Sequence, residues 1–470
     1  MLIFKLMKRT DRLFHMNYMY LLIACLIFLG CKKQNDWLDI KANKNDVVPQ
    51  TLTDFQAILD NTDRMNVTSA AGLPGSDNTY LTDASFSAST QDERNLYTWK
   101  KEIWSLDNAI TWSYSFRTIG LANVILDGLN KIEAKGEIYN NIKGQALFHR
   151  AFAYYNMAQL FCHPYSPSAN TDLGLPLRTN SDVTVITQRA SLSQTYEQII
   201  SDALLATELL ATSQTYVQRP VRSAAYALLA KIYLNMGDYT NGAQYADKCL
   251  ALSPQLLDFN DDTIVNLSTT YRFPAYAKNN PEVLFYTESN QFSQVLASSS
   301  SRGFIDRDLY GTYEQEDLRR VYFFATVSTG VKFRGGYSGR SPNFCGLAAN
   351  EIYFIRAECR ARDGDAAGAL ADLNLVLKNR FKSGSFTEKT TASADDALQI
   401  ILNERRKEFP ATANIRWEDL RRLNQETRFQ KTLTRSVNGT SYTLLPNDKR
   451  YTLPIPTQEI RLSGIKQNDR

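Results

Sequence analysis

Two polar stretches of the chain carry aromatic side chains beside groups that donate and accept hydrogen bonds. Between residues 66 and 100, the first stretch holds Asp77, Asn78, Tyr80, Tyr97 and Trp99. The ring of a Tyr or Trp offers an apolar face to the C–H side of a sugar, and Asp or Asn replaces the water that sugar hydroxyls lose. A buried polar group left without a partner would cost about 1–3 kcal/mol. This combination predicts a saccharide-binding surface.

The second stretch, residues 253–310, has the same character. Its candidate ligand-binding residues are Tyr271, Arg272, Phe273, Tyr276 and Arg302. The two arginines could equally meet the carboxylate of a peptide, so saccharide and peptide both remain candidate ligands. For any single ring, the alternative role is to anchor a long loop to the body of the protein. For the two groups together, we expect at least one ring to contact ligand.

Residues that could perform catalysis or hold a metal are scarce. After residue 30 the only histidines are His149 and His163, and the sequence has no Gly-rich phosphate loop, zinc-spaced Cys/His cluster or nucleophile elbow. The acidic run from Asp258 to Asp262 supplies oxygen ligands but lacks the Gly and the distal Glu of an EF-hand loop. A carboxylate pair for glycoside hydrolysis is defined by distance in space, so the sequence does not exclude one. We expect no enzymatic activity, no cofactor and no metal.

The scaffold that positions these side chains is predicted to be helical. In Arg222–Leu252, apolar residues recur at helical spacing on either side of Gly237, which predicts a helical hairpin. A second copy places Ala357 and Gly364 seven residues apart, like Ala230 and Gly237. Such a unit resembles a tetratricopeptide repeat, which cannot bury its apolar face alone. More than one helix pair is therefore expected.

The fold class predicted from these patterns is mainly α, a tetratricopeptide-like helical-repeat scaffold with long loop insertions and a few short strands. The single domain is expected to span residues 50–470, with repeat helices near residues 109–161, 191–252, 350–380 and 397–424. One pair is expected to join the helix Ala109–Ile132 with a C-terminal helix. Loop insertions on the ligand side are expected near residues 66–100 and 253–310. The Arg/Glu run from Glu404 to Glu408 is expected to form exposed or partly buried ion pairs between helices.

The N-terminus has the features of a secretory signal peptide in residues 1–30. A basic region precedes about fifteen mostly apolar residues, which suits a signal peptide better than a membrane-spanning helix. The segment ends in Phe28-Leu29-Gly30-Cys31, and a small residue before Cys predicts a bacterial lipoprotein whose N-terminus becomes the acylated Cys31. Residues 31–49 would then form a lipidated tether, with the acyl chains as the only membrane attachment. The alternative is a soluble secreted protein in which Cys31 is incidental.

The composition is that of an ordinary globular protein and excludes few functions. Hydrophobic residues make up 43% of the 470 residues and charged residues 22%. The net charge is only +4, and much of that excess lies in residues 1–30. Nucleic-acid binding would need a concentrated basic excess, so we expect no nucleic-acid partner.

Seven stretches along the chain, in their order and spacing, resemble the SusD/RagB-like nutrient-binding outer-membrane lipoproteins of Bacteroidetes. They are Cys31 followed by WLDIKANKNDVVPQTLTDFQAILDN, RAFAYYNMAQLF from Arg150, YEQEDLRRVYFF from Tyr313, NEIYFIRAECRARDGD from Asn350, NERRKEF from Asn403, RWEDLRRLN from Arg416 and LPIPTQEI from Leu453. One departure is the segment from Pro410 to Ile415, where the family commonly has a Glu-Gly-His-like run.

The resemblance implies four tetratricopeptide-like helix pairs and a lipid anchor at the external face of the outer membrane. It also implies a partner, a SusC-like TonB-dependent transporter, over which the protein sits as a lid and to which it delivers captured glycan or peptide. In the family the repeats contact the transporter and the ligand lies against the loops. The leading hypothesis is a non-catalytic oligosaccharide-binding lipoprotein. A peptide-binding protein of the same architecture, a helical-repeat scaffold that binds only proteins, and a hydrolase are the alternatives.

Overall fold

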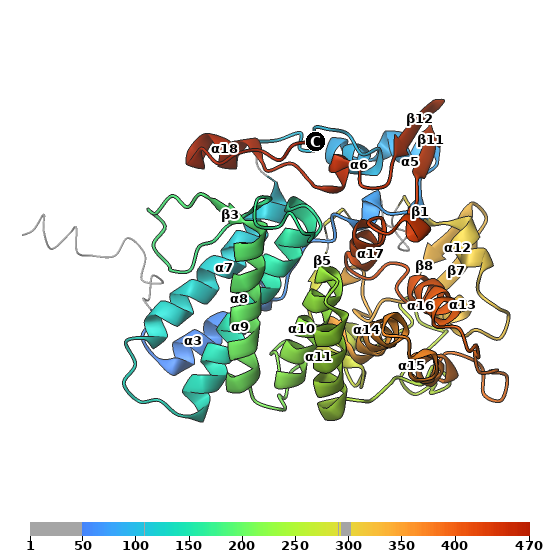
Figure 1. The fold of residues 1–470 in the computed structure, drawn as a ribbon, viewed down its shortest axis with the longest axis horizontal. Helices are drawn as coiled ribbons and strands as arrows, with labels where there is room; N and C mark the ends of the chain where they lie inside the picture. The colour runs from blue at the N-terminus through green and yellow to red at the C-terminus, as the bar shows by residue number, and fades with distance from the viewer. Residues whose placement is uncertain (1–48, 108, 290, 293–301) are drawn as a thin grey trace, which may run out of the picture. The chain divides into compact units, whose positions relative to one another are not determined.

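Helices account for most of the secondary structure in the computed structural model, and several long ones lie side by side (Figure 1). The structure describes residues 49–107, 109–289, 291–292 and 302–470. The predictions for the signal peptide, for Cys31 and for the tether up to residue 48 lie outside the described residues. Within those described ranges, no helix combines the length and the apolar composition that crossing a bilayer requires. The predicted fold class, mainly α with few short strands, is confirmed.

The elements comprise long helices, short helices and short strands. The long helices are α7 (Ile110–Leu129), α8 (Glu137–Phe161), α9 (Leu192–Leu209), α10 (Arg222–Met236), α11 (Tyr239–Leu252), α14 (Ala349–Arg362), α15 (Ala366–Lys378), α16 (Ala394–Glu408) and α17 (Ile415–Leu423). The short helices are α3 (Leu52–Leu59), α4 (Thr62–Met65), η1 (Leu73–Gly75), α5 (Asp83–Ala88), α6 (Gln91–Tyr97), η2 (Ala275–Ala277), α12 (Arg307–Gly311), α13 (Arg319–Tyr322), η3 (Thr427–Phe429), η4 (Lys449–Tyr451) and α18 (Thr457–Ser463).

The strands form antiparallel pairs and no larger sheet within the described ranges. The pairs are β1 (Thr79–Tyr80) with β6 (Phe304–Ile305), β2 (Leu173–Pro176) with β3 (Arg189–Ser191), β4 (Val283–Phe285) with β10 (Leu347–Ala348), β5 (Glu288–Ser289) with β9 (Asn343–Phe344), β7 (Phe324–Val327) with β8 (Gly330–Phe333), and β11 (Leu433–Val437) with β12 (Thr440–Leu444). The first of these pairs sets Tyr80 opposite Phe304, so the two predicted insertions meet there.

Two helical hairpins follow the sequence pattern closely. Between α10 and α11, Gly237 has a φ of 77°, a left-handed conformation that a residue without Cβ adopts at little cost. Between α14 and α15, Gly364 plays the same part with a φ of 90°. Asp238 and Asp365 then cap α11 and α15 by accepting hydrogen bonds from backbone N–H groups. Both predicted hairpins are confirmed.

The predicted partner of the helix Ala109–Ile132 is wrong. This helix, α7, packs along α8 rather than along a C-terminal helix, and α9 packs on another side of α8. The reason lies in α8, because its residues from Gly144 to Phe161 are all buried and one neighbouring helix could not cover them. Figure 1 shows α7, α8 and α9 next to one another.

The first insertion is more ordered than the predicted loop, since η1, β1, α5 and α6 lie within it. Thr90 and Glu93 form a capping box at the start of α6, in which each side chain accepts a hydrogen bond from the other residue's backbone N–H. This pairing is visible in the sequence as Thr-x-x-Glu, and it signals the helix that the prediction missed.

The second insertion and the residues that follow it form a separate hydrophobic core, in addition to the large core between the long helices. The buried rings of this core include Phe259, Phe273 and Tyr286 of the insertion and Phe323, Tyr337 and Phe344 after it. These rings meet edge-on or tilted, as do Phe259 and Phe273 with centroids 5.4 Å apart. Aromatic residues among polar neighbours in this part of the sequence therefore serve mainly to give the insertion a packed interior.

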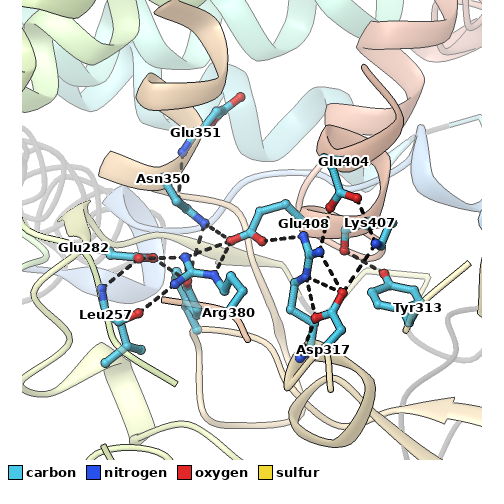
Figure 2. Close-up of polar contacts among 12 residues, drawn as sticks. Leu257, Glu282, Tyr313, Asp317, Asn350, Glu351, Arg380, Glu404, Lys407 and Glu408 are labelled. Carbon is cyan, nitrogen blue, oxygen red and sulfur yellow. Dashed lines mark hydrogen bonds and ion pairs between the residues drawn. The ribbon is translucent and has the colours of Figure 1, made fainter. Parts of the chain in front are cut away.

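A buried ion network joins the second insertion to the repeat helices (Figure 2). Arg380, just after α15, donates to Glu282 of the insertion at 2.7 Å and to Glu408 of α16 at 2.9 Å. Arg319 donates to Glu404 of α16 at 2.6 Å. The prediction of exposed or partly buried ion pairs on α16 is wrong for Glu408, whose side chain is fully buried. Arg319, Arg380 and Asn350 enclose the carboxylate of Glu408, and the sequence alone does not reveal that these residues meet there.

Candidate functional site

Four of the five candidates from the first stretch line one cavity of about 410 Å³. They are Asp77, Tyr80, Tyr97 and Trp99. The opposite wall comes from distant parts of the chain, namely Asp306, Asp308, Arg406 and residues 431–436 on and before β11. The fifth candidate, Asn78, is fully buried next to the cavity, where it donates to the carbonyl of Pro410 at 3.1 Å and accepts from Arg406 at 2.9 Å.

Asp77 is held in the cavity wall by three cations. Arg416 donates to its two carboxylate oxygens at 2.7 and 2.8 Å, Lys431 donates at 2.7 Å, and the guanidinium of Arg406 lies 3.3 Å away. Burial raises the pKa of Asp77, but these cations outweigh burial and hold the pKa well below its usual value. Asp77 is therefore a fixed, ionised acceptor.

Tyr80 is the half-buried ring of this cavity. It stacks on Phe304, with ring centroids 5.4 Å apart and planes inclined by 26°, and the guanidinium of Arg307 lies 5.6 Å from its centroid. Its hydroxyl accepts from Arg307 at 3.4 Å. Because strand pairing and stacking fix the ring, it needs little ordering to bind a ligand.

Tyr97 and Trp99 support the cavity from behind. Each is only 2% exposed, and the indole of Trp99 donates to the carbonyl of Gly75 at 2.9 Å. The guanidinium of Arg435 lies 3.8 Å from the centroid of Tyr97 and 4.5 Å from that of Trp99, a cation–π arrangement. Arg435 was not among the predicted site residues, since it lies more than 300 positions away on β11 and no local pattern connects it to these rings.

The candidates of the second stretch do not share one surface. Phe273 is 4% exposed inside the aromatic core, so its ring cannot meet a ligand there, which corrects the prediction for this residue. Arg272 donates to the backbone carbonyls of Leu267 and Thr269 in its own loop. Tyr271 and Arg302 are half-buried.

Tyr276 is the exposed aromatic of the second stretch, with 48% of its surface accessible. Its φ of 58° is left-handed, a conformation that costs free energy in a residue with a Cβ and that often marks functional sites. The guanidinium of Arg340 lies 4.1 Å from its ring centroid and 3.2 Å from the carboxylate of Glu288. This arrangement fixes an aromatic ring at the surface.

The chemistry available at these positions is recognition by hydrogen bonds and ring faces. Hydroxyls, fixed carboxylates and guanidinium groups surround the cavity at Tyr80. Across the part of the chain that the structure describes, no group of three or more His, Cys, Asp and Glu side chains is arranged to hold a metal ion.

Residues 36–234 match the family model described as "Starch-binding associating with outer membrane", and residues 327–469 match the model described as "SusD family". SusD-like protein P2 of Formosa agariphila is 32% identical over 425 residues, which cover 76% of this chain and 79% of that protein. The chain belongs to the SusD family. Proteins of this family bind ligands such as carbohydrates and are associated with the outer membrane.

Solved structures agree with this assignment at the level of the fold. A SusD superfamily protein from Bacteroides thetaiotaomicron has a TM-score of 0.73 at 21% identity, covering 89% of this chain and 100% of its own. A putative sugar binding protein from Bacteroides vulgatus has a TM-score of 0.70 at 22% identity, covering 90% of this chain and 99% of its own. The SusD-like helical-repeat architecture thus extends over nearly all of the chain.

Proposed function

We propose that this SusD-family protein is a non-catalytic surface lipoprotein that binds an oligosaccharide and delivers it to a SusC-like TonB-dependent transporter. The observation that carries the proposal is the cavity that sets Tyr80 beside the fixed carboxylate of Asp77. In it, Tyr80 is the ring that stacks on a sugar, and Asp77 accepts hydrogen bonds from sugar hydroxyls.

The charges around the cavity favour an uncharged glycan over a peptide. Arg406 is engaged by Asp77 and Asp306, Lys431 by Asp77, and Arg435 by the carbonyls of Pro74, Tyr97 and Ser76. Arg406 and Lys431 are therefore already paired with carboxylates, and the guanidinium of Arg435 is already hydrogen-bonded to the backbone. A peptide terminus would have to displace one of these contacts, whereas a sugar hydroxyl can join them.

The test is isothermal titration of the chain from Lys32 onward with neutral oligosaccharides and with short peptides. We expect saturable binding of at least one oligosaccharide and no release of reducing ends during prolonged incubation. Binding of peptides alone would favour the peptide-binding alternative. Binding of neither class would favour a protein-interaction scaffold, and turnover of a bound glycan would require a hydrolase.

The anchor and the partner need a separate test. Metabolic labelling with radioactive palmitate is expected to mark the protein and to fail in Cys31→Ser, because the acyl chains attach through that residue. The labelled protein, extracted gently from outer membranes, is expected to co-purify with a TonB-dependent transporter. Labelling that persists in Cys31→Ser would contradict the lipoprotein proposal.

A further inference from the structure

A second hollow shares no lining residue with the cavity at Tyr80. Two cavities, of about 510 and 350 Å³, have Ser166 and Gln425 in common, and we take the two together as one groove. Its walls are the segment that follows α8, the residues after α17, and residues 447–452 around η4. We call it the His163 groove. None of the candidate residues predicted from the sequence lies in it.

Hydrogen bonds between the walls fix the form of this groove. Arg421 of α17 donates to two backbone carbonyls at the C-terminal end of α8. The amide of Gln425 donates to the carbonyl of Tyr165 at 3.2 Å, and that of Asn447 donates to the carbonyl of Asn424 at 2.8 Å. Walls that are already tied together lose little conformational entropy when a ligand enters.

The charged side chains of the groove have partners within the described chain. Asp448 accepts from Arg450 at 2.6 Å, and Lys449 pairs with Asp469. Asp172 accepts from a serine hydroxyl at 2.7 Å. The buried guanidinium of Arg421 is held by the helix-end carbonyls, where a cation is favourable, while its Nε has no hydrogen-bond partner in the described chain. Each of these charged side chains is thus already engaged within the chain, and a neutral hydroxyl can join their hydrogen bonds without breaking an ion pair.

The groups that line the groove combine polar and apolar contacts. Burial, together with neighbouring cations, lowers the pKa of His163, so its imidazole is neutral at pH 7 and both donates and accepts hydrogen bonds. In the smaller cavity of the groove, the half-buried ring of Tyr165 stands edge-on to Tyr196, with centroids 4.9 Å apart, and Met236 adds apolar surface. Hydroxyls beside apolar C–H faces are the matching features of a sugar.

We propose that the His163 groove is a second, independent binding site for a neutral saccharide. Its walls are preorganised, its charged side chains already have hydrogen-bond partners within the chain, and a neutral imidazole and a tyrosine ring line it. The proposal does not depend on ligand binding at Tyr80, and the two sites can be tested separately.

The histidines provide a direct test. The chain from Lys32 onward has only two, His163 in the groove and His149, which is 2% exposed in the core. In protein labelled with ¹⁵N-histidine, the imidazole signal that disappears in His163→Asn belongs to His163, and the signal that remains belongs to His149. The probes are neutral hexasaccharides of glucose, xylose, mannose and galactose in several linkages, with trigalacturonate as an acidic probe, all at millimolar concentration.

We expect a neutral saccharide to shift the His163 signal saturably, to leave the His149 signal in place and to act equally on Tyr80→Ala. Tyr165→Ala is expected to weaken this binding by about tenfold or more. Ser166→Trp is a second variant, for the case that Tyr165→Ala does not fold. Ser166 is partly exposed, and a Trp at this position would fill the groove, so we expect the same loss of binding. The proposal is overturned if no neutral saccharide shifts the His163 signal, if only trigalacturonate does, or if Tyr80→Ala abolishes the shift.

Discussion

The carboxylate of Glu282 and the guanidinium of Arg380 lie 2.7 Å apart and are both fully buried, although 98 positions separate the two residues in the chain. This pair fastens the second insertion to the end of α15. The Tyr337 hydroxyl donates to the same glutamate, and Arg380 also reaches Glu408 of α16. The insertion that carries Tyr276 and pairs with the strand of Tyr80 is thus held by charge as well as by its aromatic core.

Arg380→Ala is expected to destabilise the protein by about 3–5 kcal/mol, because it leaves the buried carboxylate of Glu282 without a cation and leaves Glu408 with Arg319 alone. The measurement is the free energy of unfolding in urea. Arg428→Ala is the matched control, since Arg428 pairs with Asp395 at 2.7 Å on the surface and its loss should cost less than about 1 kcal/mol. Equal losses for the two variants would mean that the network does not stabilise the insertion.

His149 is expected to make folding stability depend on pH. Burial lowers its pKa to about 4, despite a hydrogen bond to the backbone of Met65 that raises it. Between pH 6.5 and 4 the unfolded chain takes up a proton that the folded chain does not. Stability is therefore full above pH 6.5 and falls as the pH drops through this window, by on the order of 3 kcal/mol in total.

The variant His149→Gln isolates this effect, because the other groups that titrate are unchanged in it. We expect the free energy of unfolding of His149→Gln to vary less between pH 7 and pH 5 than that of the wild type. Urea unfolding at several pH values measures the difference. Parallel pH profiles for the two proteins would show that His149 is not neutral in the folded state.

Gly339 holds the Tyr276 loop in close contact with its neighbour. A Cβ at this position, where φ is +59°, would lie 2.2 Å from the carbonyl oxygen of Pro274. The adjacent Ser338 carbonyl accepts from the backbone N–H of Tyr276 at 2.8 Å. Gly384 has a φ of +78° but no atom within 4 Å of its Cβ position, so it provides the control.

Gly384→Ala is expected to cost about 1–2 kcal/mol, from the left-handed backbone alone. Gly339→Ala is expected to cost a further 1–3 kcal/mol, roughly, because it adds a collision with backbone. Thermal unfolding monitored by circular dichroism compares the two variants. A Gly339→Ala variant as stable as Gly384→Ala would mean that the loop can move away at little cost.

The parts of the fold that the sequence predicts are those specified by neighbouring residues. The step from Ala230 to Gly237, repeated from Ala357 to Gly364, is local, and it predicts both hairpins correctly. Val283 to Phe285 is an uninterrupted apolar run, and it is a fully buried strand. The packing of α7 against α8 was not predictable in this way, because it depends on how many faces of α8 must be buried by neighbouring helices.

The site is harder to predict because its walls come from distant segments. Asp77 and Tyr80 share a cavity with Arg406 and Arg435, whose guanidinium groups arrive from α16 and β11. Residue type alone also misplaces rings, since an aromatic residue in a polar segment can fill a local core, as Phe273 does. The sequence supplied candidate residues in the first stretch but did not indicate which of its rings is accessible.

The most direct test of the saccharide-binding cavity is the affinity of Tyr80→Ala for the oligosaccharide that the wild type binds, measured by isothermal titration. Tyr216→Ala is the control, because Tyr216 is a 59% exposed tyrosine that does not line the cavity. Tyr80→Phe keeps the ring and loses only its hydroxyl. We predict that Tyr80→Ala binds about tenfold more weakly or worse, while Tyr80→Phe retains most of the affinity and Tyr216→Ala retains all of it. Unchanged affinity in a folded Tyr80→Ala variant would contradict the assignment of this cavity as the binding site.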